Sequence, residues 1–208
     1  MKIKPFPDIL SVLILTVIIS SDLFAQSWNF VKEKDGIKLY TRKEEANSAL
    51  KSFKGVTVLH TQMDKLSAMI GSVKNTSWWD ENVRDIQVLS YETEKYIRYY
   101  LVYHVPWPLM DRDLCVEALI ATDPVTGTRT VTAHPLPNVI PEKPELVRIT
   151  NYWQRWTLQP LDKNTILVTL EGTVDPGGNI PTWLINMVIV ETPLKIIRGI
   201  RNRVETKP

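Results

Sequence analysis

The chain has 208 residues, of which 44% are hydrophobic and 23% are charged. These proportions are typical of a globular domain and exclude an intrinsically disordered chain, which combines low hydrophobicity with high net charge. The formal net charge is only +2, with basic and acidic residues interspersed, so the sequence lacks the basic stripe of a nucleic-acid-binding protein.

The first segment, residues 1–25, has the pattern of a cleaved secretory signal. Lys2 and Lys4 precede an apolar run from Ile9 to Ile19, and the small residue Ala25 comes directly before Gln26. The run of about eleven residues is short for a membrane span, which needs ~20, although an uncleaved anchor remains the alternative. We therefore expect an exported protein, in a bacterial periplasm or otherwise secreted, whose single domain comprises residues 26–208.

The first part of this domain is predicted to contain a short helix, two strands and a second helix. Residues 27–36 are expected to form a short helix and turn, and residues 36–42 and 49–59 alternate like half-buried strands. In residues 61–73 apolar side chains recur every three or four positions, which predicts a helix.

Six strands are predicted in the central part of the chain, rich in Val, Ile, Thr, Tyr and Trp. Most are joined by short turn sequences such as DPVTG (123–127) and LDKN (161–164), which favour antiparallel pairing. Strands and helices do not alternate along the sequence, so a doubly wound parallel sheet is not expected. The predicted strands are residues 86–91, 96–105, 112–122, 128–134, 146–159 and 165–174.

One connection, residues 134–145, differs from the others because it contains four prolines and several aliphatic side chains. The prolines stiffen the segment and forbid regular structure. Such a loop is expected to cover an apolar surface, which is either a binding space or the ordinary core.

The chain ends in a predicted helix that starts near Pro181, after the turn sequence DPGG (175–178). Its apolar stripe, widened by Leu184, Val188 and Ile196, is too broad for a surface helix. A curved antiparallel sheet folded around this helix, an α+β fold, would bury the stripe. The space between sheet and helix is then either filled with side chains or partly hollow, and periodicity alone does not separate these outcomes.

Four sequence segments, taken in order, resemble the START domains, the steroidogenic-acute-regulatory-protein-related lipid-transfer domains of the helix-grip superfamily. The resemblance spans about residues 28–205. It implies an antiparallel sheet wrapped around a long C-terminal helix, with an internal hydrophobic cavity for one lipid or sterol-like molecule. The segments are WWDENVRDIQVL (78–89), WPLMDRD (107–113), LVRITNYWQRWTLQPL (146–161) and DPGGNIPTWLIN (175–186).

The same resemblance implies that residues 134–145 form a lid over the cavity, with Leu136, Val139 and Ile140 as its apolar contacts. Sterol-binding members carry a buried acidic and basic pair, whose positions correspond here to Tyr99 and Ala118. Neither residue is charged, which puts steroid recognition through that pair in doubt. Arg112 and Arg148 match family arginines whose role is structural.

Strand alternation combined with the resemblance predicts which side chains line the cavity. Among them Asn151 is the best candidate for a polar ligand contact, although a bond to neighbouring backbone would serve it equally well. The predicted lining residues are Ile97, Tyr99, Leu101, Tyr103, Leu114, Val116, Ala118, Ile149, Asn151 and Trp153 on strands and Met187, Val190 and Leu194 on the last helix.

The predicted function is therefore binding of a hydrophobic small molecule, with lipid transport or transfer as its purpose. We expect a monomer that makes transient contact with membranes. An enzyme of the cyclase or aromatase type and a filled structural module remain alternatives. His60, His104 and His134 are dispersed, and Cys115 lies on the strand face opposite Ala118. We consequently predict no catalytic residue, metal or cofactor.

Overall fold

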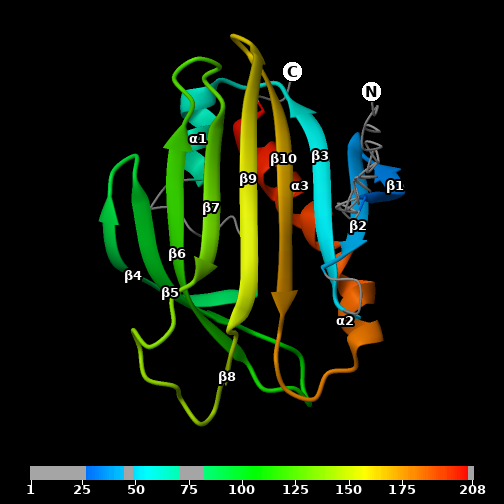
Figure 1. The fold of residues 1–208 in the computed structure, drawn as a ribbon, viewed down its shortest axis with the longest axis vertical. Helices are drawn as coiled ribbons and strands as arrows, with labels where there is room; N and C mark the ends of the chain where they lie inside the picture. Colours follow the sequence, from blue (N-terminus) through cyan, green and yellow to red (C-terminus); the bar gives the residue numbers. More distant parts are fainter. Residues whose placement is uncertain (1–26, 45–48, 71–81, 206–208) are drawn as a thin grey trace, which may run out of the picture.

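The computed structural model describes residues 27–44, 49–70 and 82–205, and the expected export signal lies outside them. A large antiparallel sheet dominates the fold, with strand order β1-β2-β3-β10-β9-β7-β6-β5-β4 (Figure 1). The strands are β1 (Asn29–Lys34), β2 (Ile37–Lys43), β3 (Lys51–Leu59), β4 (Val83–Glu92), β5 (Tyr96–Tyr103), β6 (Arg112–Thr122), β7 (Arg129–Pro135), β8 (Val147–Arg148), β9 (Asn151–Asp162) and β10 (Thr165–Asp175). The helices are α1 (Met63–Ile70), α2 (Thr182–Ile189) and α3 (Thr192–Val204).

Most predicted strands are confirmed, and β6 has the predicted bounds. The expectation of a short helix at residues 27–36 is wrong, because β1 pairs antiparallel with β2. Asp35 and Gly36 connect these strands, and both have positive φ angles, 54° and 68°. A two-residue turn with this geometry matches the twist of paired strands, so the sequence Asp-Gly makes a hairpin here.

The inner face of the sheet carries the main apolar core. Alternate strand residues from β2 to β10 join one cluster with Leu66 of α1 and with Leu194, Ile197 and Ile200 of α3. The helices lie on this one side of the sheet, with α3 running behind the central strands (Figure 1). The predicted α+β architecture, a sheet curved around a C-terminal helix, is therefore confirmed.

The single long C-terminal helix that the sequence predicts is divided into two. Helix α2 ends at Ile189, and α3 begins at Thr192 with Pro193 in its first turn. Proline lacks the backbone N–H that would continue the hydrogen-bond ladder, and its ring clashes with the preceding turn. The break is therefore caused by Pro193, and it separates α2 from the firmly packed α3.

Helix α3 approaches the backbone of β3 very closely at Gly55. A Cβ atom at this position would lie 2.9 Å from Cβ of Pro193 and 2.7 Å from Cδ1 of Ile197. Only glycine leaves room for such an approach. Gly55 therefore fixes the distance between the start of α3 and the sheet.

Candidate functional site

The candidate site is the inner face of β5 and β6, where most of the predicted lining residues meet. These residues are buried in the main apolar cluster or packed against it, and none of them is charged. They are Ile97, Tyr99, Leu101, Tyr103, Leu114, Val116, Ala118, Ile149, Val190 and Leu194. The first seven share the inner face of β5 and β6, and Ile149, Val190 and Leu194 join the same apolar cluster from other segments. Contact of any of them with a ligand stays a prediction.

Tyr99, Tyr152 and Gln154 form a group of polar side chains on this apolar surface. The Tyr152 hydroxyl donates a hydrogen bond to Gln154 Oε1 at 2.7 Å, and Tyr99 lies close enough to Tyr152 to interact with it electrostatically. Burial raises the pKa of Tyr99 well above its usual value, and the Tyr152 hydroxyl adds to this shift. Burial also raises the pKa of Tyr152. Both phenols therefore stay protonated and offer neutral hydrogen-bonding groups inside an apolar space.

Asn151 and Trp153 do not face the interior, so this expectation is wrong. Asn151 is exposed, and Trp153 Nε1 donates to Glu44 Oε1 at 3.3 Å beside Arg42 on the outer face. The reason is a break in alternation, because Ile149 is buried but neither it nor Thr150 belongs to a strand. A slip of one residue transfers every following side chain to the other face.

Tyr152 and Gln154 therefore take the inner positions on β9, together with Trp156 and Leu158. The sequence prediction missed them. A signal was present, because the alternate set contains the charged residue Arg155, which belongs in solvent rather than in an apolar interior.

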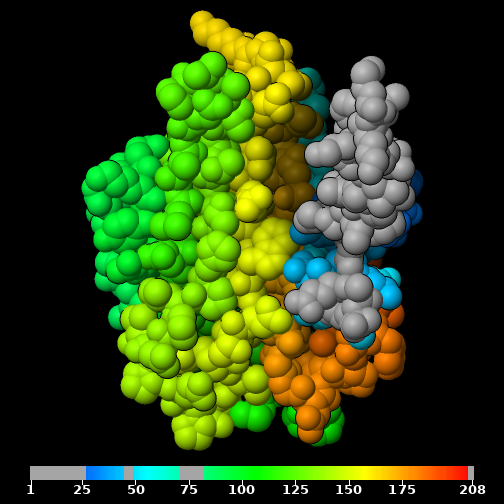
Figure 2. All heavy atoms as spheres, in the orientation of Figure 1, coloured from blue at the N-terminus to red at the C-terminus, as the bar shows by residue number. Residues whose placement is uncertain are grey.

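The predicted lid also lies elsewhere. Leu136 and Ile140 pack against Tyr100, Val102 and Cys115 in a second apolar cluster. These strand residues alternate with the inner set, so residues 136–146 cover the outer face of β5 and β6. Figure 2 views this face and shows the segment, in yellow-green, over its lower part. Val139 is exposed, and the expectation that this loop closes the interior is wrong.

A buried ion pair holds this outer loop in place. Arg148 donates to both carboxylate oxygens of Asp113 at 2.8 Å, and its Nη1 donates to the carbonyl of Ile140 at 3.0 Å. The hydrogen bonds to Asp113 raise the pKa of Arg148. These contacts support the structural role that the resemblance implied for Arg148.

Cys115 is buried beneath the same loop. Its burial raises the pKa of the thiol, which opposes formation of the nucleophilic thiolate. Within the described residues, no group of three or more His, Cys, Asp or Glu side chains is placed to hold a metal ion. Burial therefore disfavours Cys115 as a nucleophile.

Exposed apolar side chains gather at the lower end of the molecule, on two segments that the sequence analysis did not combine. The β5–β6 loop, residues 104–111, exposes 91% of Trp107, together with Leu109 and Met110. Helix α2 exposes 68% of Trp183 and 59% of Met187. The predicted inward position of Met187 is therefore wrong, because Ile189 is the residue that α2 buries in the core.

These two segments are neighbours in space. Atoms of the β5–β6 loop, in green, emerge beside the orange turn that leads into α2 (Figure 2), and Arg112 Nε donates to the carbonyl of Pro176 at 3.2 Å.

None of the helices in the described ranges is long and apolar enough to span a membrane.

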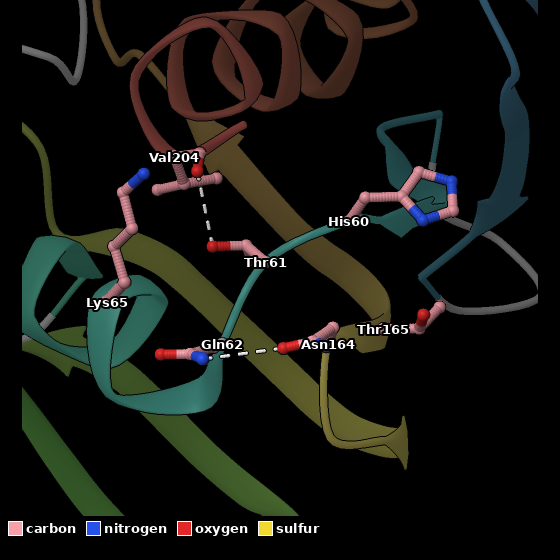
Figure 3. Close-up of a pocket in the computed structure, with 7 residues that line it drawn as sticks. All are labelled: His60, Thr61, Gln62, Lys65, Asn164, Thr165 and Val204. Carbon is pink, nitrogen blue, oxygen red and sulfur yellow. Dashed lines mark hydrogen bonds between the residues drawn. The ribbon is translucent and has the colours of Figure 1, made fainter. Parts of the chain in front are cut away.

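A separate surface pocket of about 430 Å³ lies at the other end of the sheet, between α1, the β9–β10 turn and the end of α3 (Figure 3). Its polar groups largely bond to one another. Gln62 Nε2 donates to Asn164 Oδ1 at 3.4 Å, and the Thr61 hydroxyl donates to the carbonyl of Val204 at 3.2 Å. These two bonds use the side chains of Thr61, Gln62 and Asn164, and the pocket lies away from the inner face of β5 and β6, so it is not the candidate site.

Comparison with known proteins agrees with this architecture. The sequence model of the START domain matches residues 22–207. The crystal structure of a STAR-related lipid transfer protein from Xanthomonas axonopodis is 30% identical and superposes with a TM-score of 0.75, covering 84% of this chain and 97% of that one.

Two curated proteins are similar in sequence. An uncharacterised protein of Pseudomonas aeruginosa is 28% identical, with 91% of this chain and 92% of the relative covered. The phosphatidylcholine transfer protein of Bos taurus is 25% identical, with 79% of this chain and 78% of the relative covered. Together with the family match over nearly the whole chain, these findings show that the protein belongs to the START-domain family.

Proposed function

We propose that the protein binds one hydrophobic molecule, a lipid or a sterol-like compound, between the inner face of its sheet and its C-terminal helices. The observation that carries this proposal is the apolar inner face of β5, β6 and β9, which neutral hydroxyl groups interrupt. Its charged residue, Arg112, lies at the very start of β6 and bonds to backbone carbonyls. Similarity to lipid transfer proteins supports it.

The chemistry of this face indicates what the ligand carries. Burying ~400 Å² of apolar ligand surface yields roughly 10 kcal/mol before the costs of association and ordering are subtracted. Hydrocarbon thus supplies most of the affinity. Tyr99, Tyr152 and Gln154 would bond to a single polar group of the ligand, which selects its class.

We propose further that loading and release occur at a membrane surface, which the lower end of the molecule contacts transiently. Trp107 and Trp183 expose large apolar areas on neighbouring segments, and indole rings favour the boundary between lipid and water. Replacing both tryptophans by serine is expected to reduce binding to phosphatidylcholine vesicles in a flotation assay. Replacing the exposed Leu161 and Val125 at the opposite end by serine serves as the control.

The proposed setting is an exported monomer, in a bacterial periplasm or secreted. The evidence that supports export is the pattern of residues 1–25. Mass spectrometry of the protein from its own host tests this: the intact mass should correspond to a chain that begins at Gln26. Retention of residues 1–25 would contradict cleavage.

Native mass spectrometry followed by lipid extraction tests the central proposal. Protein purified from its own host should carry the mass of one hydrophobic molecule, which extraction then identifies. Consistent absence of any bound molecule would contradict the carrier function. A second assay separates transfer from storage: fluorescent phospholipid should move between vesicles faster in the presence of the protein, and a carrier that never moves lipid would instead store or sense it.

A further inference from the structure

Arg112, the first residue of β6, holds together the two segments that carry the exposed apolar side chains. Its side chain is buried, and its hydrogen bonds go to backbone carbonyls. The guanidinium donates to Met110 through Nη1, to Pro176 through Nε at 3.2 Å, and to Gly177 through Nη2 at 3.4 Å. Met110 belongs to the β5–β6 loop, and the other two carbonyls belong to the turn that leads into α2.

The local sequence builds this turn around the guanidinium. Gly177 and Gly178 have φ angles of 65° and 70°, a region that other residues rarely adopt. The Gly177 N–H donates to Asp175 Oδ1 at 3.0 Å, which fixes the start of the turn. A Cβ atom at Gly178 would lie 3.7 Å from Arg112 Nη2, so the glycines let the backbone lie against the arginine.

Because Arg112 is buried, movement of one of the two segments favours movement of the other. Desolvation lowers the pKa of Arg112, and the nearby Asp111 opposes this shift. The hydrogen bonds that stabilise the buried guanidinium are those to the three carbonyls. If either segment moved alone, a buried cation would lose hydrogen bonds while remaining out of water, which is costly. Moving both segments together opens the site to water, which then solvates the charge.

We propose that Arg112 is a latch that couples the β5–β6 loop (104–111) to the α2 turn (176–181), so that the two segments open as one unit. The outer loop, residues 136–146, is held by a different arginine, Arg148, on the opposite face. The bonds of Arg148 to Asp113 and Ile140 involve neither latched segment, although the neighbouring Val147 N–H donates to the carbonyl of Asp111 at 3.0 Å. This difference supplies a matched control for the experiment.

Hydrogen exchange measured by mass spectrometry tests the coupling in the purified protein. Arg112→Lys is expected to raise exchange in residues 104–111 and 176–189 together, by about tenfold, because lysine cannot reach three separated carbonyls. Arg148→Lys should raise exchange in residues 136–146 and leave the other two segments unchanged. Increased exchange in only one latched segment, an equal increase in all three, or no increase would overturn the proposal.

A second variant perturbs only one side of the latch and keeps the test valid if Arg112→Lys does not fold. Gly178→Ala strains the α2 turn through its positive φ, without altering the β5–β6 loop. Coupling predicts faster exchange in residues 104–111 as well. Faster exchange confined to the turn would refute the latch.

A kinetic readout rests on the proposed function and separates the latch from a merely structural arginine. With fluorescent phosphatidylcholine as the probe, weakening the latch should accelerate loading and release by similar factors, while the equilibrium affinity stays nearly constant. Slower loading, or faster release with unchanged loading and hence reduced affinity, would overturn the gating role. If the wild-type protein does not bind this probe, phosphatidylcholine is excluded as its ligand, and the exchange result still decides whether the segments are coupled.

Discussion

Ala118 of β6 faces Ala133 of β7 across the inner surface of the sheet. The two residues are paired in register, and both are buried. Ile97 lies on the other side of Ala118 in the same cross-strand row. Two methyl groups side by side occupy little volume, so this part of the row is where a ligand would find space.

Ala118→Phe is therefore expected to reduce the lipid retained by the purified protein while leaving its thermal stability nearly unchanged. The added ring would enter the volume that the ligand takes. In an interior already filled with side chains, the same change would instead cost about 1–3 kcal/mol by overpacking. Lipid extraction and thermal melting distinguish the two cases.

Ala121→Phe is the matched control for this substitution, because Ala121 is an exposed residue of the same strand. Neither lipid content nor stability should change in the control. Unchanged lipid content in Ala118→Phe would refute the assignment of Ala118 to the ligand-contacting face.

Tyr152→Phe tests the neutral polar cluster. The change removes the hydroxyl that donates to Gln154 while keeping the ring, so the apolar packing is preserved. We expect the affinity for the retained lipid to fall about three- to tenfold, the value of one hydrogen bond. Native mass spectrometry with lipid titration measures this, and the exposed Tyr91 provides the control variant Tyr91→Phe. Equal affinities in both variants would exclude Tyr152 from the site.

Strand positions were predictable because alternation and turn sequences are local. The faces of β6 follow directly from its alternating pattern. The faces of β9 do not, because the two residues between β8 and β9 shift the alternation by one position. Val147 and Arg148 of β8 pair parallel with β6 while β9 pairs with β7 and β10. This change of partner depends on contacts distant in sequence, so periodicity could not indicate it.

The lid was misplaced for a related reason. A stiff apolar loop has the same sequence pattern whichever face of a sheet it covers. Its position is decided by Arg148, whose side chain reaches Asp113 on the outer face. The break between α2 and α3, in contrast, could have been predicted from the sequence, because proline at position 193 cannot continue a preceding helix.

Gly55→Ala is expected to destabilise the protein by about 1–3 kcal/mol, because the new methyl group would collide with α3. The Pro193 ring is rigid and cannot move aside. The other contact is Cδ1 of Ile197, a methyl group that the substitution Ile197→Val removes. Equilibrium unfolding in urea measures the change. Ile197→Val alone should cost about 0.5–1.5 kcal/mol.

The double variant with Gly55→Ala and Ile197→Val provides the control for this contact. Its destabilisation should be smaller than the sum of the two single changes, since valine lacks the atom that the new methyl group meets. Strict additivity would show that the new methyl group collides with the Pro193 ring rather than with Ile197 Cδ1.

The β5–β6 loop is expected to loosen in acid because of Asp111. Its Oδ1 accepts a hydrogen bond from the Val105 N–H at 3.0 Å and lies 3.0 Å from His104 Nδ1. The bond from Val105 and the interaction with His104 lower the pKa of Asp111. Since the folded pKa is below that of the unfolded chain, the stabilisation is complete above about pH 4 and is lost as the pH falls through the lowered value.

The Val105 amide resonance reports this titration directly by nuclear magnetic resonance. Between about pH 6 and about pH 2, it should show an inflection below the ordinary aspartate pKa, which disappears in Asp111→Asn. The Val125 amide, which donates to Asp123 Oδ1 at 2.8 Å, should keep its own inflection in that variant. An inflection of Val105 at or above the ordinary value would mean that the carboxylate does not anchor the loop, because protonation would then cost the folded state nothing extra.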